Sequence, residues 1–306
     1  MLDPAFAEAV LEFDCGRERL WGILSRPAPG VSEAEIAVVI LVGGPQYRVG
    51  SHRQFVLLGR ALARAGFPAL RFDYRGMGDS AGEQRDFEQI EPDLRAALGA
   101  LAGVCPSARR FVVWGLCDAA AAALMFATGD ARVAGIVAAN PWARSDASLA
   151  AARVKHYYGR RLLEREFWVK LLRGGLDWRA SLGALGSNLR SARRLGRAGE
   201  GDAAALPFQT RMAHGLAAFR GRVLLILSGN DITAKEFLQY TDSAAGWKGL
   251  LSDSKVRRID IPEADHTFSS RAWMTRAEQA TIEWLQGFEV SSAPAHGAPD
   301  TASEEA

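Results

Sequence analysis

The sequence predicts an α/β fold, in which a mostly parallel β-sheet is flanked by helices. Apolar, β-branched runs such as EIAVVILVGG at 35–44 are continuous, which is typical of parallel strands buried on both faces. These runs alternate with stretches whose apolar residues have helical spacing. The length of 306 residues and the hydrophobic content of 48% also suffice for a substantial core. Together these observations favour a sheet covered by helices on both sides.

Each predicted element follows from one of these patterns. The first two strands are separated by the short stretch CGRE and resemble a hairpin. With the later apolar runs, the predicted strands lie at 8–14, 18–25, 35–44, 68–74, 110–115, 132–141, 221–231 and 255–266. The predicted helices lie at 51–67, at 86–102, in the alanine-rich part of 109–129 and at 271–288.

The pattern changes between two consecutive strands. Residues 141–220 are helical in character and lack strand-like runs, so we predict a helical cap insertion there. The core is then formed by 1–140 and 221–288. Residues 289–306 are small, polar and proline-containing, which predicts a disordered tail.

Composition limits the kind of protein. The formal net charge of +2 is too small to indicate binding of nucleic acid or a membrane surface by the whole chain. No apolar stretch reaches the roughly 18 residues typical of a membrane span, and the first residues lack the pattern of a signal peptide. We therefore expect a cytoplasmic protein with no nucleic-acid partner and no stable membrane insertion. The sequence carries no indication of the oligomeric state.

Cys117 lies in the sequence GLCDA, between a predicted strand and the alanine-rich helix. The small residues Gly115 and Ala119 relieve crowding in such a turn, and a helix N-terminus favours a thiolate. This context predicts that Cys117 is a nucleophile. Cys15 and Cys105 lack it and are expected to be small buried hydrophobic residues.

A base and an acid are predicted at the ends of two later strands. Asp231 follows the strand at 221–231, and His266 follows the last strand, so the chain order is nucleophile, acid, histidine. An aspartate at this place is also typical of a turn or a helix cap. Asp265 is a rival acid, but it ranks below Asp231 because it would have to reach the ring of its own neighbour.

The loop after the strand at 35–44 is the predicted source of an oxyanion donor. Two glycines allow a close backbone approach, and Pro45 has no N–H to donate. Gly44 is therefore the first choice and Gln46 the second, with the backbone N–H of Asp118 as partner. The alternative is a glycine-rich turn without a ligand. Candidates that could line a substrate are Gln46, Arg48 and His52.

The stretch RGMGDSA at 75–81 matches G-x-G-x-x-A, a spacing found in dinucleotide sites. It does not open a helix immediately, and its strand is not the first of a βαβ nucleotide unit. We therefore interpret it as a structural turn.

Over about residues 8–288 these pieces resemble the α/β-hydrolase superfamily, through VGGP, FDYRGMGDS, GLCDA, GND and ADH. More narrowly, GGPQYRVGSHRQF with WGLCDAA resembles the exosortase A system-associated hydrolase, type 1, of bacteria with exosortase and exopolysaccharide gene clusters. The resemblance implies an α/β-hydrolase fold with Cys117, Asp231 and His266 as catalytic triad. Cysteine instead of serine at 117 departs from the wider superfamily, but dienelactone-hydrolase-like enzymes use the same set.

The predicted reaction is hydrolysis of an ester, thioester or lactone through an acyl-enzyme, with no metal or organic cofactor. Two alternatives stay open: an acyltransferase with the same triad, and a non-catalytic ligand-binding member of an envelope-polymer assembly system. The expected substrate is a small-molecule or lipid-like acyl compound. The predicted cap is basic, which fits either a solvated face or a mouth that attracts anionic substrates. Its basic residues include Arg153, Lys155, Arg160, Arg161, Arg190, Arg193, Arg194 and Arg197.

Overall fold

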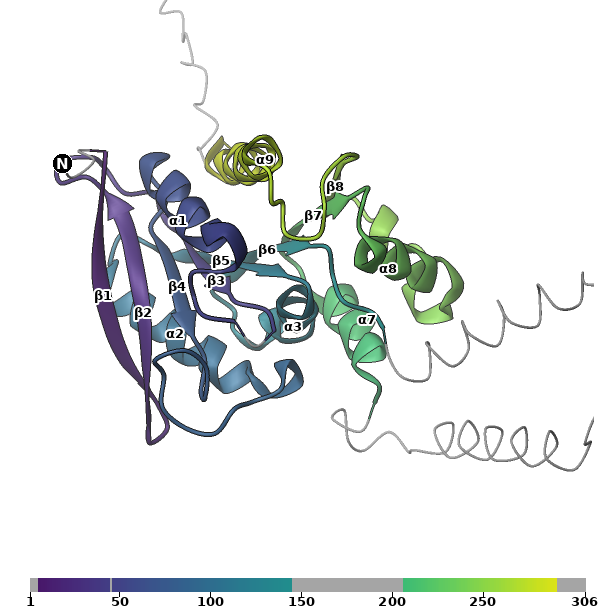
Figure 1. Ribbon diagram of the computed structural model, residues 1–306, viewed down its shortest axis with the longest axis horizontal. Coiled ribbons are helices and arrows are strands. Elements are labelled where there is room, and N and C mark those ends of the chain that lie inside the picture. The colour runs from purple at the N-terminus through teal and green to yellow at the C-terminus, as the bar shows by residue number, and fades with distance from the viewer. Residues whose placement is uncertain (1–4, 45, 145–205, 291–306) are drawn as a thin grey trace, which may run out of the picture.

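The structure is a computed structural model that describes residues 5–44, 46–144 and 206–290. Its strands are β1 (Phe6–Cys15), β2 (Glu18–Pro27), β3 (Ile36–Leu41), β4 (Ala69–Asp73), β5 (Arg110–Leu116), β6 (Val133–Ala139), β7 (Arg222–Ser228) and β8 (Val256–Ile261). They form one eight-stranded sheet in the order β1-β2-β4-β3-β5-β6-β7-β8 (Figure 1). β2 is antiparallel to both of its neighbours, and all other neighbouring strands pair in parallel. The predicted mostly parallel sheet is thus confirmed.

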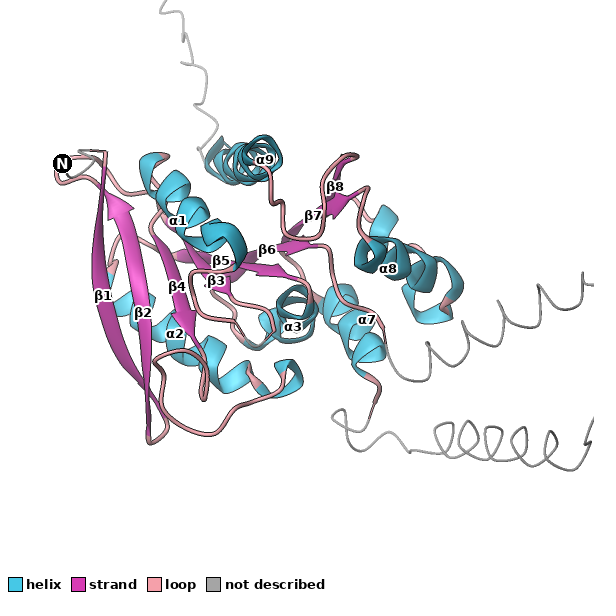
Figure 2. Ribbon diagram, in the orientation of Figure 1, coloured by secondary structure: helices cyan, strands magenta, loops and turns pink. Residues whose placement is uncertain are grey.

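Helices cover both faces of this sheet (Figure 2). The α-helices are α1 (Gln54–Arg64), α2 (Glu91–Val104), α3 (Asp118–Phe126), α7 (Phe208–Ala218), α8 (Ile232–Ser243) and α9 (Arg271–Val290). One buried cluster contains side chains of α1 and α9, and the other contains side chains of α2, α3, α7 and α8. Short 3-10 helices are η1 (Ser51–Arg53), η2 (Phe87–Gln89), η3 (Ala127–Gly129), η5 (Ala245–Trp247) and η6 (Leu250–Ser252).

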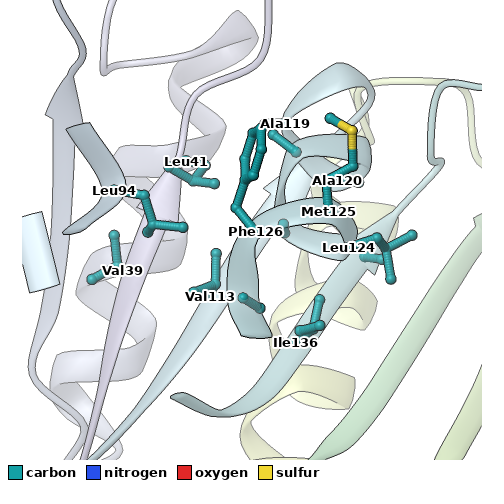
Figure 3. Packing of buried hydrophobic residues seen from close by; sticks show 14 of the residues in the cluster. Val39, Leu41, Leu94, Val113, Ala119, Ala120, Leu124, Met125, Phe126 and Ile136 are labelled. Carbon is teal, nitrogen blue, oxygen red and sulfur yellow. The ribbon is translucent and has the colours of Figure 1, made fainter. Parts of the chain in front are cut away.

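The central strand β3 is apolar and buried at every position because both faces of the sheet are covered. Val38 of β3 packs in the cluster on the side of α1 and α9, whereas its neighbour Val39 packs on the side of α2 and α3, and both are fully buried. Figure 3 shows Val39 in one cluster with Leu94 of α2 and Val113 of β5. Successive side chains of a strand point to opposite faces, so a two-sided core requires the continuous run that the sequence has.

Several predicted elements differ from the structure at their ends, and two of them differ most. The helix predicted at 86–102 begins at Glu91, because Asp86 caps the separate turn η2 by accepting the N–H of Glu88. The strand predicted at 255–266 ends at Ile261. The turns that follow it carry His266.

Most of the predicted cap, residues 145–205, lies outside the described residues, as do the eight basic residues named above and residues 291–306 of the predicted tail. The boundaries of the cap therefore stay a prediction. Within the predicted range, α7 packs on α3 so closely that a Cβ at Gly215 would lie 2.0 Å from the carbonyl oxygen of Leu124. In the described ranges, no helix is both long and apolar enough to cross a bilayer.

Candidate active site

Cys117 lies in a sharp turn between β5 and α3, where the side chain is half-buried. Its backbone φ of 62° and ψ of −124° lie outside the regions that L-residues favour. The turn leaves no room for a side chain at Gly115, where a Cβ would lie 2.4 Å from the carbonyl oxygen of Ala119. The small residues around Cys117 therefore permit a turn that places its sulfur at the carboxyl end of β5. Cys15 and Cys105, by contrast, are buried among apolar side chains.

Asp231 and His266 reach the same edge of the sheet from β7 and β8. Nδ1 of His266 lies 2.8 Å from Oδ2 of Asp231. The side chain of Cys117 lies close enough to the imidazole to raise its pKa as well. The structure thus brings these three residues together in the order Asp231, His266, Cys117.

Asp231 caps α8 with the same carboxylate. Its Oδ1 accepts the N–H of Thr233 over 3.0 Å, and Oδ2 accepts the N–H of Ala234 over 3.2 Å. Asp231 is therefore both the cap of α8 and the acid beside His266, and it serves both roles in the same orientation. The two cap bonds hold the carboxylate where it meets His266.

Charge is concentrated on this pair. Hydrogen bonds to Asp231 and Cys117 raise the pKa of His266 to about 10, although burial acts in the opposite direction. Burial raises the pKa of Asp231, but the hydrogen bond and the positive charge of His266 outweigh it and hold this pKa below its ordinary value. At neutral pH the pair is an imidazolium that faces a carboxylate.

Asp265, the rival acid, bonds to other partners. Its carboxylate accepts the N–H of Thr267 over 3.2 Å and both the N–H and the hydroxyl of Ser269. Burial raises the pKa of Asp265, but these bonds, together with the nearby side chain of His52, leave it lowered. His52 itself is exposed in η1, just before α1, with a positive φ of 53°.

Sequence reasoning missed Asn140, which is fully buried after β6. Its Nδ2 donates to the main-chain carbonyl of His266 over 3.0 Å and to Oγ of Ser228 over 2.9 Å. Its Oδ1 accepts the N–H of Ser228 over 2.8 Å. The amide therefore ties the ends of β6 and β7 to the turn that carries His266. The available signal was the polar residue that interrupts the apolar run AANP.

The loop after β3 faces the nucleophile turn. The N–H of Gly44, the first-choice oxyanion donor, donates to both carboxylate oxygens of Asp118 over 2.8 and 2.9 Å. Oδ1 of Asp118 also accepts the N–H of Ala119 over 2.9 Å. Burial raises the pKa of Asp118, and these backbone bonds oppose the shift. The second-choice donor, Gln46, uses its backbone N–H on the carbonyl of Gly44.

Arg48 anchors the loop after β3 to the protein through two ion pairs. Its buried guanidinium pairs with the fully buried carboxylate of Asp73 and, over 2.8 Å, with Asp79. Its backbone N–H donates to Asp73 over 2.6 Å. The side chains of Arg48 and Gln46 are thus engaged within the protein, the latter on the carbonyl of Gly43.

The turn at 75–81 packs against its own surroundings. A Cβ at Gly78 would lie 2.2 Å from the carboxylate of Asp73, and a Cβ at Gly76 would lie 2.1 Å from the backbone nitrogen of Gln84. Both glycines have positive φ. Close packing and backbone conformation account for the glycine spacing here.

A cavity of about 310 Å³ adjoins the loop and the nucleophile turn, and its lining includes Gly44, Tyr74, Arg85, Phe87 and Asp118. Tyr74 donates its hydroxyl to the carbonyl of Gly44 over 3.3 Å. In the part of the chain that the structure describes, no three His, Cys, Asp or Glu side chains are grouped so as to hold a metal ion.

The sheet order, the turn at Cys117 and the meeting of an acid and a histidine beside it define a hydrolase of the α/β type. The model of the family described as "Alpha/beta hydrolase family" matches residues 38–284, and the chain belongs to this family. Comparison with curated proteins gave no match.

Solved structures with the same fold include esterases and a dienelactone hydrolase. Esterase Pf2001 of Pyrococcus furiosus superposes with a TM-score of 0.60 at 18% identity, covering 93% of this chain and 92% of the other. Est1E of Butyrivibrio proteoclasticus, with bound ferulic acid, gives 0.59 at 15% identity, covering 92% and 99%. Dienelactone hydrolase of Anabaena variabilis gives 0.58 at 15% identity, covering 92% and 98%. At these identities the likeness shows the α/β-hydrolase fold alone.

Proposed function

We propose that the protein hydrolyses an ester, thioester or lactone with Cys117 as nucleophile, His266 as base and Asp231 as the acid that orients it. The observation that carries this proposal is that His266 bonds to Asp231 over 2.8 Å while the side chain of Cys117 interacts with the same imidazole, at one edge of the sheet. A nucleophile beside a base that a third group orients is the arrangement that covalent acyl transfer needs. The esterases and the dienelactone hydrolase among the structural neighbours support the same reaction class.

In the first half of the reaction, the sulfur of Cys117 attacks the carbonyl carbon while its proton resides on His266. A C–S bond forms, and the carbonyl π electrons move to the oxygen. The tetrahedral intermediate collapses, and the leaving alkoxide or thiolate takes the proton from the imidazolium. Asp231 stabilises the imidazolium and fixes the ring by its bond to Nδ1.

In the second half, water attacks the thioester of the acyl-enzyme. His266 accepts the proton of this water and returns it to the sulfur as the carboxylic acid leaves. An acyltransferase would use an alcohol or amine in place of water, so product analysis with an added alcohol separates the two activities. The backbone N–H groups of Gly44 and Asp118 are the proposed donors to the developing oxyanion.

The test is a set of nucleophile variants assayed with small nitrophenyl esters and acyl thioesters. Cys117→Ala should lower kcat/KM by about 10⁴-fold or more while the protein stays folded. Cys117→Ser should retain weak activity, because a site built for thiolate and imidazolium need not activate a hydroxyl. Mass spectrometry should detect an acyl adduct on Cys117 in the wild type. Full activity of Cys117→Ala would refute the proposal.

The narrower assignment, to a cytoplasmic hydrolase linked with exosortase and exopolysaccharide systems, rests on the stretches GGPQYRVGSHRQF and WGLCDAA. An envelope-polymer role fits an acyl substrate that is lipid-like or anionic. Deletion of the gene in its native host, followed by exopolysaccharide quantification and lipid profiling, tests this assignment. Complementation by the wild type but not by Cys117→Ala would tie the phenotype to the site.

A further inference from the structure

The carboxylate of Asp118 occupies the loop that should receive a substrate oxyanion. Both of its oxygens accept the N–H of Gly44, over 2.8 and 2.9 Å. The fit is tight, because a Cβ at Gly43 would lie 2.3 Å from Oδ1 of Asp118. The loop has a glycine at the place where the carboxylate needs room.

These contacts have the geometry of an oxyanion hole that already holds an anion. Donors of such a site lie about 2.7–3.1 Å from the oxyanion, and the oxygens of Asp118 lie within this range of Gly44. A substrate oxyanion would have to share this one N–H with the carboxylate of Asp118. Like charges at such a distance repel, so both cannot bind well at once.

We infer that Asp118 is a specificity-determining residue: its carboxylate acts as an internal anion on Gly44 and disfavours acyl substrates that cannot displace it. This inference rests on the proposed function, since it assigns Gly44 to the oxyanion. Small neutral esters gain little binding energy away from the reacting centre and are poor substrates of the wild type. Asp118 also lines the cavity beside the loop, which gives the carboxylate space to turn away when a larger substrate binds.

The test compares Asp118→Ala and Asp118→Asn with the wild type on one small neutral nitrophenyl ester. The alanine variant frees the N–H of Gly44 and should raise kcat/KM about tenfold, a part of the 10²–10³-fold effect of one oxyanion donor. Asparagine keeps the shape and one acceptor oxygen but loses the charge, so the kcat/KM of Asp118→Asn should lie between those of the wild type and Asp118→Ala. If Asp118 only braces the loop, the order reverses, with alanine slowest and asparagine near the wild type.

Asp130→Asn is the matched control. Asp130 also accepts a backbone N–H, that of Arg132 over 3.0 Å, but it lies before β6, at the other end of the strands. The kcat/KM of Asp130→Asn should stay within about twofold of the wild-type value, because a charge so far from the site has only a small effect on it. If Asp118→Ala fails to fold, Asp118→Asn decides alone, because a rate below that of the wild type contradicts the inference.

A second readout needs no turnover. The sulfur of Cys117 adds to the carbonyl carbon of a small alkyl trifluoromethyl ketone, and the resulting oxyanion lies in the loop. Iodoacetamide alkylates the same sulfur and releases iodide, so it forms no oxyanion. Asp118→Ala should bind the ketone about tenfold more tightly while its alkylation rate changes much less. An unchanged affinity for the ketone would overturn the inference.

The double variant with Cys117→Ala separates the two hypotheses. If the ester turnover of Asp118→Ala persists without Cys117, the proposed function is wrong and the inference falls with it. If turnover requires Cys117 but Asp118→Ala is no faster than the wild type, only the inference is wrong.

Discussion

The side-chain amide of Asn140 donates a hydrogen bond to the main-chain carbonyl of His266 over 3.0 Å. The same amide exchanges two hydrogen bonds with Ser228 at the end of β7. All of the amide's contacts are made in a fully buried position. The turn that presents the imidazole is thus fixed to the sheet by a side chain that does not take part in the triad, and the position of His266 depends on it.

Asn140→Gly should reduce activity by misplacing the base. Glycine tolerates the positive φ of 42° at this position but removes all three side-chain hydrogen bonds. We expect unfolding to become easier by about 1–3 kcal/mol, because buried partners on Ser228 and His266 lose their hydrogen bonds. The value of kcat should fall while KM changes little, since the base and not the binding surface moves.

Two further variants make the test of Asn140 specific. Asn140→Asp keeps an acceptor for the N–H of Ser228 but cannot donate to His266 when ionised, so it should also lose kcat. Asn230→Ala changes an exposed asparagine in the turn before Asp231 and should behave like the wild type. An Asn140→Gly variant with lowered stability and unchanged kcat would show that the amide serves the fold alone.

The Asp231–His266 pair should be visible in a titration. The pKa of His266 is raised to about 10 by its bonds to Asp231 and Cys117, so Asp231→Asn should bring it back toward the ordinary value of 6.5. NMR of the imidazole ring nitrogens measures this directly in both proteins. A His266 resonance that titrates near pH 6.5 in the wild type would contradict the ion pair.

The same pair gives stability a pH dependence of known sign. A pKa that is raised in the folded state contributes stability that is fully present below pH 6.5 and is lost as the pH rises through about 10. The wild type should therefore lose more stability than His266→Gln over this window. Urea unfolding of both proteins between pH 6 and 10 measures the difference, and parallel curves would exclude a stabilising imidazolium.

The nucleophile turn should not tolerate a single added methyl group. Gly115→Ala would place a Cβ 2.4 Å from the backbone oxygen of Ala119, so the backbone around Cys117 must move. We expect a loss of about 1–3 kcal/mol of stability and a strong loss of kcat. Thermal unfolding and ester turnover measure both effects.

Gly99→Ala is the control for this change. Gly99 lies in α2 with nothing within 4 Å of an added Cβ. Alanine there should stabilise the protein by about 0.5–1 kcal/mol through helix propensity and leave turnover unchanged. Equal behaviour of the two variants would show that the turn at Cys117 is not sterically constrained.

The fold could be predicted because its main determinants are local. Continuous apolar runs require strands covered on both faces, and helical spacing supplies the covering layers. The neighbouring positions of Asp231 and His266 could also be predicted from the sequence, since residues that follow parallel strands must arrive at the same edge of the sheet. Which N–H the carboxylate of Asp118 accepts depends on a loop 74 positions earlier in the chain. Such a choice between partners is set by tertiary packing and is not encoded in any local pattern.

The partners of Arg48 are likewise set by tertiary packing and not by a local sequence pattern. Its place in a glycine-containing loop suggested a substrate-lining residue, whereas in the structure its guanidinium is buried on Asp73 and reaches Asp79. Arg48→Met should therefore leave the carboxylate of Asp73 buried without its cation, at a cost of about 3–5 kcal/mol in unfolding free energy. Asp79→Asn, which changes the exposed partner, should cost much less stability, because water screens an exposed charge.

The two roles of Arg48 differ in what they do to substrates of different charge. A residue that braces the loop affects neutral and anionic esters of equal chain length alike, because it moves Gly44 for both. A residue that binds substrate raises KM for the anionic ester only and leaves stability unchanged. Measuring both esters on Arg48→Met and Asp79→Asn, together with urea unfolding, decides between them. We expect a loss of stability with an equal effect on the two esters, because the charge of Arg48 is already neutralised inside the protein.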